Sequence, residues 1–255
     1  MFVTFVVMSR KFLHLAYKGT NFFGWQIQPN QISVQEEIEK ALTRLNGNKP
    51  VKITGCGRTD TGVHASDYYA HFDQEFQLDS DQLQFKLNNM LHHDIVVYKV
   101  IDVHDDAHAR FDATARTYHY FIHQEKDPFI HEISWKRKGD LDIEKMNEAC
   151  QLLLEHEDFE CFSKVKTDVT NFNCNISQAI WIPSDKGYIF SITANRFLRN
   201  MVRAIVGTMI EVGESKITLE EFETILQSKN RSEAGQSVPA NGLFLAKIEY
   251  DYIEV

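Results

Sequence analysis

A short glycine-rich loop carries the residues of this sequence that are best suited to chemistry. Residues 55–65 read Gly-Cys-Gly-Arg-Thr-Asp-Thr-Gly-Val-His-Ala, so one carboxylate, Asp60, stands among glycines and polar side chains. Glycine permits tight turns that a side chain would block, and catalytic residues are often carried on loops between rigid elements. Asp60 is therefore a candidate catalytic residue. Aspartate is also a common turn former, which leaves a structural role open at this point.

Other site chemistries find little support in the sequence. No lysine follows a glycine at the spacing of a phosphate-binding loop, and no P-C-x-x-C segment supplies the ligands of a zinc deaminase. The neighbours His92 and His93, and the pair His104 and His108, have no further ligand at a recognisable zinc spacing. We interpret all four as solvated loop histidines and expect no metal.

Hydrophobic periodicity predicts the elements that position the loop. Strands are predicted at residues 11–17, 51–55, 68–72, 95–103, 116–123, 175–182, 188–194 and 244–250. Helices are predicted at residues 33–47, 80–91, 142–154 and 197–212, followed by a short helix. The pairs Ser33 with Glu36 and Thr218 with Glu221 predict capping boxes at two of the helix starts.

The order of these elements is β-α-β-β-α-β, and it occurs twice. We therefore predict an α+β fold of two tandem ferredoxin-like subdomains, residues 1–108 with the Asp60 loop and residues 109–255, with a catalytic cleft between them. The length agrees, because 255 residues at roughly 150 per domain suggest two domains.

The composition is that of an ordinary globular protein, with 43% hydrophobic and 25% charged residues. The four cysteines form no C-x-x-C pair, which indicates neither a zinc site nor a disulfide framework and favours a reducing, cytoplasmic compartment. Residues 1–8 are apolar but lack the basic region and the length of a signal peptide, and no later apolar run is long enough to span a membrane. Either these residues extend the first strand or Met8 is the true start.

The loop at residues 57–65 closely resembles the catalytic motif of the TruA family of tRNA pseudouridine synthases, whose usual form has alanine in place of Thr61. Lys18 replaces an acidic residue that is common in the family's first motif. The resemblance continues in order along the chain, through Tyr17-Lys18-Gly19-Thr20, Phe23-Gly24-Trp25-Gln26, Ala109-Arg110-Phe111, Arg116-Thr117-Tyr118-His119-Tyr120, Asp158-Phe159, Phe197-Leu198-Arg199-Asn200-Met201-Val202-Arg203, and Arg231 to Leu243.

The resemblance implies a cofactor-free isomerase that converts uridine to pseudouridine at positions 38 to 40 of the tRNA anticodon stem-loop. It also implies a homodimer, with the tRNA lying across both subunits. By the same resemblance Asp60 is the nucleophile, Arg203 pairs with it, Tyr118 stacks on the target base, Arg58 helps to extrude that base, and Leu245 lines the uracil pocket.

Each of these residues also has a structural interpretation. Arg203 could be a surface arginine at a helix end, Arg58 could form a salt bridge with Asp60, and Tyr118 and Leu245 could be core residues of strands. Tyr120 would face the same side of its strand as Tyr118, and for it we favour the core interpretation.

The formal charge of −9 argues against a general attraction to nucleic acid. Residues 187–210, however, contain no acid, which is the segregation that a groove for a polyanion would need on an acidic protein. We expect RNA contacts from Arg110, Arg116, Lys166, Arg196 and Arg199.

Two alternatives come from other classes of protein. Ferredoxin-like sheets also bind single-stranded RNA without catalysis, which suggests a non-catalytic RNA-binding module of RRM-like subdomains, although neither half shows the usual aromatic signature. An aspartyl-phosphate enzyme would need a second aspartate two residues after Asp60, where Gly62 stands.

Overall fold

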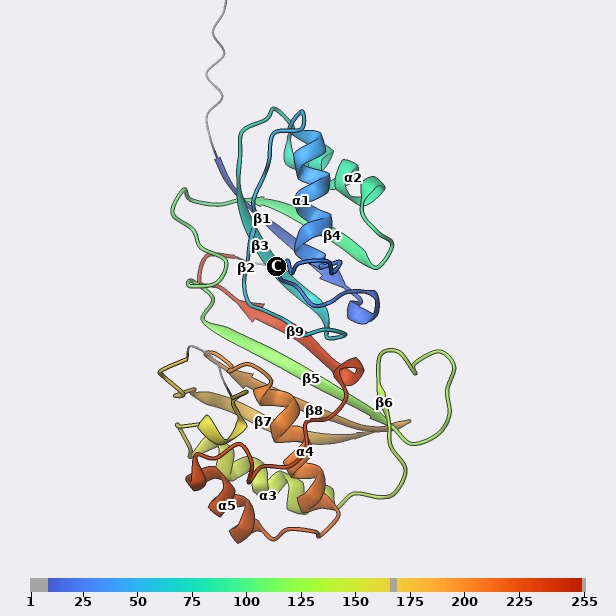
Figure 1. The fold of residues 1–255 in the computed structure, drawn as a ribbon, viewed down its shortest axis with the longest axis vertical. Coiled ribbons are helices and arrows are strands. Elements are labelled where there is room, and N and C mark those ends of the chain that lie inside the picture. Colours follow the sequence, from blue (N-terminus) through green and yellow to red (C-terminus); the bar gives the residue numbers. More distant parts are fainter. Residues whose placement is uncertain (1–8, 166–168, 254–255) are drawn as a thin grey trace, which may run out of the picture. The chain divides into compact units, whose positions relative to one another are not determined.

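A computed structural model describes residues 9–165 and 169–253, which form two compact units (Figure 1). The second unit is Ala115–Phe244, and the first consists of the described residues before it together with those from Leu245 onward. The predicted division at residue 108 therefore differs from the observed one. The C-terminal segment joins the first unit because Thr114 donates its backbone N–H to Glu249 O (2.8 Å) and the Tyr250 ring packs edge-on against Phe12 (5.6 Å between centroids).

The first unit has a sheet in the strand order β4-β1-β3, and both β2 and β9 are neighbours of β3. The pairs of β1 with β3, β1 with β4 and β2 with β3 are antiparallel. The helices α1 and α2 contact each other and lie over these strands in Figure 1. The elements are β1 (Ser9–Tyr17), α1 (Val34–Leu45), β2 (Thr54–Gly55), β3 (His64–Gln74), α2 (Ser80–Met90), β4 (Ile95–Asp102) and, from Leu245 onward, β9 (Leu243–Glu249).

The strand predicted at residues 51–55 is reduced to the two residues of β2. Side chains of α1 take the hydrogen bonds that a strand partner would otherwise provide. Val51 donates its N–H to Thr43 Oγ1 (3.1 Å), and Ile53 donates its N–H to Glu39 Oε1 (3.1 Å). Both side chains are buried, so this segment has the hydrophobic character of a strand without the pairing.

The second unit repeats the arrangement of the first. Its sheet has the order β5-β8-β7 with antiparallel pairs, as β1-β3-β2 has in the first unit, and β6 adds to β5 in parallel. The prediction of tandem ferredoxin-like units is confirmed by this repetition. The elements are β5 (Ala115–His123), β6 (Trp135–Lys136), α3 (Ile143–Leu154), β7 (Ile176–Ser184), β8 (Gly187–Ala194), α4 (Met201–Gly213) and α5 (Leu219–Ser228).

Helix starts follow local capping chemistry more closely than hydrophobic periodicity. The capping box of Thr218 and Glu221 is present at α5, whereas at α1 Ser33 accepts the Glu36 N–H and the Glu36 carboxylate pairs with Lys40 (2.8 Å). The predicted start of α4 at residue 197 is wrong. Asn200 has a left-handed backbone (φ 66°), which no α-helix can include, so α4 begins at Met201.

The cysteines and the helices bear on the compartment that the sequence predicts. All four cysteines are buried and free, in agreement with the absence of a disulfide framework. In the part of the chain that the structure describes, no helix combines the length and the apolar character needed to cross a bilayer. Residues 1–8, on which the choice of start depends, lie outside the described residues.

A buried histidine ties the loop after β4 to the sheet. His71 on β3 is 7% exposed, and its Nδ1 accepts the backbone N–H of Ala109 (3.1 Å), which requires that Nδ1 carry no proton. The pKa of His71 is lowered to about 4, chiefly by burial and also by the neighbours His108 and Arg10, whereas the carboxylates of Asp73 and Asp112 oppose the shift. The neutral imidazole is therefore part of the folded structure.

Acid should destabilise the protein through His71. Because the folded-state pKa lies below the usual 6.5, the unfolded chain binds the proton more readily, and the free energy of unfolding should fall as the pH drops from 6.5 towards 4. The loss from this one group is roughly 3 kcal/mol. His71→Asn keeps an acceptor near the Nδ1 position without a titratable ring, so its urea-unfolding free energy should fall less over that pH range. The exposed His131→Asn serves as control, and equal pH dependence of the wild type and His71→Asn would contradict this role.

Candidate active site

The Asp60 loop, defined as residues 57–65, connects β2 to β3 through a tight turn. The Asp60 carbonyl accepts the Val63 N–H (3.1 Å), which closes the turn. Thr59 and Val63 are buried on either side, whereas the Asp60 side chain is half-buried. The loop therefore anchors itself by its flanking residues and leaves the carboxylate within reach of solvent.

The loop rests against a second segment, the supporting turn, defined as residues 17–25. Trp25 donates its backbone N–H to the Thr59 carbonyl (3.2 Å). Gly24 has φ +82°, and a Cβ built there would lie 2.4 Å from the Thr59 oxygen. Only glycine fits this position, because any side chain would meet both the strained backbone angle and the neighbouring carbonyl.

The other end of the loop is held at Gly19. The Gly19 N–H donates to Nδ1 of His64 (3.0 Å), whose side chain is completely buried. A Cβ at Gly19 would lie 2.0 Å from the Val63 oxygen. The residues on both sides of Asp60 are thus in close backbone contact with the supporting turn.

Three buried aromatic residues complete the support. Tyr17 Oη and Thr59 Oγ1 share a hydrogen bond of 2.7 Å, and Tyr68 Oη donates to the Gly57 carbonyl. Trp25 stacks on Tyr68 with 4.1 Å between ring centroids. Sequence reasoning missed these roles: Tyr17 and Trp25 belong to the matched motifs, but nothing in the sequence links them to the loop around Asp60.

The two departures from the family pattern have different surroundings. Lys18 donates its backbone N–H to the Asp94 carbonyl (2.9 Å), and its Nζ lies 4.0 Å from Asp94 Oδ1. A cation at position 18 is therefore matched by a carboxylate in this chain. Thr61, next to Asp60, is exposed, as is Arg58 on the other side of the loop.

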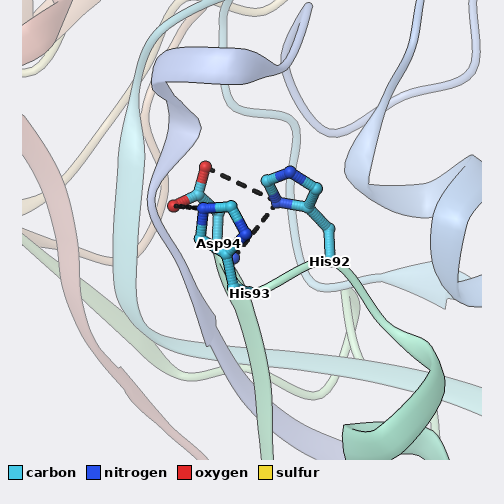
Figure 2. A group of neighbouring side chains, drawn as sticks. All are labelled: His92, His93 and Asp94. Atoms are coloured by element: carbon cyan, nitrogen blue, oxygen red, sulfur yellow. Dashed lines mark hydrogen bonds and ion pairs between the residues drawn. The ribbon is translucent and has the colours of Figure 1, made fainter.

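One cluster of potential metal ligands lies beside the supporting turn. Within the described residues, only His92, His93 and Asp94 bring three ligand atoms within 4.8 Å of one another. Figure 2 shows both rings directed at the carboxylate, with Nδ1 of His92 3.6 Å and Nε2 of His93 3.7 Å from its oxygens. Asp94 Oδ2 also accepts Asn21 Nδ2 (2.7 Å), and a metal cation would meet the Lys18 ammonium. That no metal binds here stays a prediction.

In the second unit, Tyr118 lies on β5 opposite Ile192 and is half-buried. Its ring meets Phe197 edge-to-face, with 5.1 Å between centroids. Tyr120 is completely buried and donates its hydroxyl hydrogen to the Pro239 carbonyl (2.8 Å), so the core interpretation of Tyr120 is confirmed.

Arg203 lies in the first turn of α4 and is half-buried. Its Nε donates to the Val238 carbonyl (2.7 Å), and its own carbonyl accepts the Val238 N–H (3.2 Å). Asn200, just before the helix, donates to Ser237 Oγ (2.6 Å). Arg203 thus lies at a helix end, as the structural interpretation expects, but it is half-buried and held by the segment that precedes β9.

The expected RNA-contacting cations lie in different places. Arg116 donates to the Asn195 carbonyl (2.7 Å) and pairs with Ala194 across the sheet, which places it at the end of β8 where residues 195–199 begin. Arg196 is half-buried and Arg199 exposed in that segment. Arg110 belongs to the first unit, and Lys166 lies outside the described residues.

The predicted catalytic residues are divided between the units. Asp60 and Arg58 belong to the first unit, Tyr118 and Arg203 to the second, and the pairing of Asp60 with Arg203 stays a prediction. Leu245 on β9 is 1% exposed, and its carbonyl accepts a hydrogen bond from Ser66 Oγ (3.5 Å). The role of Leu245 in lining a uracil pocket also stays a prediction.

Comparison with known proteins identifies the class. A family model described as tRNA pseudouridine synthase matches residues 14–112 and 149–251. The chain is 51% identical over 244 residues to tRNA pseudouridine synthase A of Parabacteroides distasonis, covering 95% of this chain and 96% of that protein. It is 51% identical over 246 residues to the protein of the same name from Bacteroides thetaiotaomicron (95% and 91%), and 38% identical over 248 residues to that of Staphylococcus aureus strain JH1 (96% and 92%).

The matched regions fall on the two repeated units described above. The chain belongs to the tRNA pseudouridine synthase family, and it is an enzyme of that family.

Adding a methyl group to the supporting turn should displace the Asp60 loop. We expect Gly24→Ala to lower the single-turnover rate of pseudouridine formation by about 100-fold, because a displacement near 1 Å is enough to misplace a reacting group. The change does not touch the expected RNA-contacting cations, so the affinity for tRNA, measured by filter binding, should stay within about threefold.

Gly47→Ala is the matched control. Gly47 also has a positive φ (+62°) but nothing lies within 4 Å of its built Cβ, so the variant bears the backbone strain without the clash. It should lose about 1 kcal/mol of stability and keep its rate. If Gly24→Ala folds and reacts as fast as Gly47→Ala, the loop does not depend on this contact.

Proposed function

We propose that this enzyme converts uridine to pseudouridine at positions 38 to 40 of the tRNA anticodon stem-loop, with Asp60 as the nucleophile. The observation that carries the proposal is the half-buried Asp60 carboxylate, presented on a loop whose backbone is fixed at Thr59 and Val63 by the supporting turn. A covalent nucleophile needs this combination of fixed position and access to its substrate.

The proposed reaction rearranges bonds within the substrate. The carboxylate attacks the ribose or the uracil ring, the bond from C1′ to N1 breaks, and the base rotates. A new bond then forms between C1′ and C5, and the bond between the Asp60 carboxylate and the substrate breaks to restore the free carboxylate. The C5 hydrogen leaves as a proton, and N1 takes up a proton. No electrons are gained or lost overall, so the reaction needs no cofactor.

Other residues would prepare the substrate and the nucleophile. We propose that Arg58 helps to extrude the target nucleotide, since an enzyme must take a stacked base out of its helix before acting on it. Tyr118 would stack on the uracil, and Leu245 would supply an apolar wall. Arg203 would keep the carboxylate ionised, because a nearby guanidinium stabilises the negative form.

The partner in this proposal is tRNA, bound by a homodimer in the cytoplasm. Arg116 beside the end of β8, and Arg196 and Arg199 in the segment that follows β8, would contact phosphates, with Arg110 and Lys166 as further contacts. Such a local patch suits a protein with a formal charge of −9, whose non-specific affinity for RNA should be small.

The substitution Asp60→Asn should abolish isomerisation. The amide has nearly the size of the carboxylate but cannot act as the nucleophile, so release of tritium from the uracil C5 of unmodified tRNA should fall to background. The tRNA affinity should remain within about threefold of the wild-type value, because the Asp60 side chain acts in the reaction and does not bind phosphates.

Asp81→Asn, which changes an exposed carboxylate in the first turn of α2, is the matched control and should release tritium at the wild-type rate. Release that persists in Asp60→Asn would remove Asp60 from the mechanism. If the wild-type protein binds tRNA but releases no tritium from any tRNA tested, the result would favour the non-catalytic RNA-binding module.

A further inference from the structure

An exposed phenylalanine lies at the tip of a loop in the first unit. Phe111 is 74% exposed, and only Phe129 (87%) among the exposed large hydrophobic residues of the described chain exceeds it. It belongs to the loop of residues 107–112, which follows β4. A single exposed aromatic ring is common on protein surfaces, so the surroundings of this ring decide what it could bind.

The base of the loop is fixed by side chains from three parts of the unit, of which those of His71 and Tyr250 are buried and that of Arg10 is partly buried. Arg10 on β1 donates from Nη1 to the Ala107 carbonyl (3.1 Å), and His71 on β3 accepts the Ala109 N–H (3.1 Å). Tyr250, which is 8% exposed, donates its hydroxyl hydrogen to the Ala109 carbonyl. The loop is thus anchored to the sheet and to the C-terminal segment.

The tip of the loop is organised around His108. Its Nδ1 accepts the backbone N–H groups of Arg110 (3.1 Å) and Phe111 (3.2 Å), and its ring lies 4.3 Å from the Phe111 ring. Asp112 accepts the His108 N–H (2.7 Å) and also the hydroxyl hydrogen of Tyr252 (2.8 Å). These bonds fix the backbone on both sides of Phe111, so the ring is held outward by a rigid loop.

A cation accompanies the ring. The Arg110 guanidinium carbon lies 5.7 Å from the centroid of Phe111, within cation–π range, and Arg110 is exposed. Proteins bind unpaired nucleobases with a pre-organised aromatic ring beside a guanidinium. The base stacks on the ring, and the cation adds stacking or a phosphate contact.

We propose that Phe111 and Arg110 form a stacking site for an unpaired nucleobase of the tRNA substrate. This inference rests on the proposed function and names a contact that it requires beyond the target uridine. The exposed acids Asp105 and Asp106 lie on the same connection, which disfavours a site for phosphate alone. The ring therefore supplies the main interaction, and the site should tolerate any base.

Three substitutions of Phe111 distinguish stacking from general apolar contact. Phe111→Ala should weaken tRNA binding by roughly 5- to 100-fold, the range found for loss of one base–aromatic stack. Phe111→Trp should retain wild-type affinity because it keeps a stacking surface, whereas Phe111→Leu should behave as Phe111→Ala does. The slope of log affinity against log salt concentration should stay unchanged in all three variants. Arg110→Gln should reduce the size of that slope by about one, the value for loss of one phosphate contact.

The matched control is Phe85→Ala, which removes a ring of nearly equal exposure (70%) from α2 in the same unit. It should bind tRNA as the wild type does. The inference is overturned if Phe111→Ala binds tRNA normally, if Phe111→Leu restores the affinity, or if Phe85→Ala is equally impaired. A change in oligomeric state of Phe111→Ala, measured by sedimentation, would also overturn it by assigning the ring to a protein contact.

Tritium release separates this inference from the proposed function. A wild-type enzyme that releases tritium while Phe111→Ala binds tRNA normally would leave the proposed function standing and remove only the stacking site. A wild-type enzyme that releases none would overturn the proposed function itself.

Discussion

The close backbone contact between the supporting turn and the Asp60 loop is the constraint on which the candidate site depends. The carbonyls of Thr59 and Val63 approach Gly24 and Gly19 so closely that no side chain fits between them. Hydrogen bonds from Trp25 and Gly19 secure the two ends of the same contact. The two segments, which α1 and β2 separate in the sequence, are thereby held together, and the backbone of Asp60 lies between the two contacts.

In this arrangement the supporting residues are more buried than the residues they hold. The supporting residues Tyr17, Trp25, Tyr68 and His64 are buried, while Asp60 is half-buried and its neighbours Arg58 and Thr61 are exposed. A reacting group that is positioned before the substrate arrives avoids part of the entropy cost of the reaction. The loop of residues 107–112 follows the same design, because buried groups at its base hold an exposed ring at its tip.

Much of the fold could be predicted from the sequence because it is encoded by local patterns. Alternating and helical periodicity located most strands and helices, and Thr218 with Glu221 formed the expected capping box. The errors in element boundaries arose where contacts between distant residues, or an unusual backbone conformation, determine the local structure. The segment before β2 bonds to α1 side chains instead of a strand, and the left-handed Asn200 delays α4.

The candidate site was predicted less completely. The motif around Asp60 identified the loop, but the bond from Tyr17 to Thr59 and the match of Lys18 with Asp94 join residues far apart in sequence, and periodicity carries no information about such contacts. The position of the Arg203 side chain depends in the same way on the remote carbonyl of Val238.

Whether the supporting turn positions Asp60 is tested most directly by a double-mutant cycle on the hydrogen bond between Tyr17 and Thr59. The single-turnover rate of pseudouridine formation is measured at saturating enzyme for Tyr17→Phe, Thr59→Val and the double variant. Each single change should lower the rate by about fivefold or more, and the double variant should react no more slowly than the slower single variant, because all three lose the same interaction. Single variants that react at the wild-type rate, or effects that multiply in the double variant, would contradict this role of the turn.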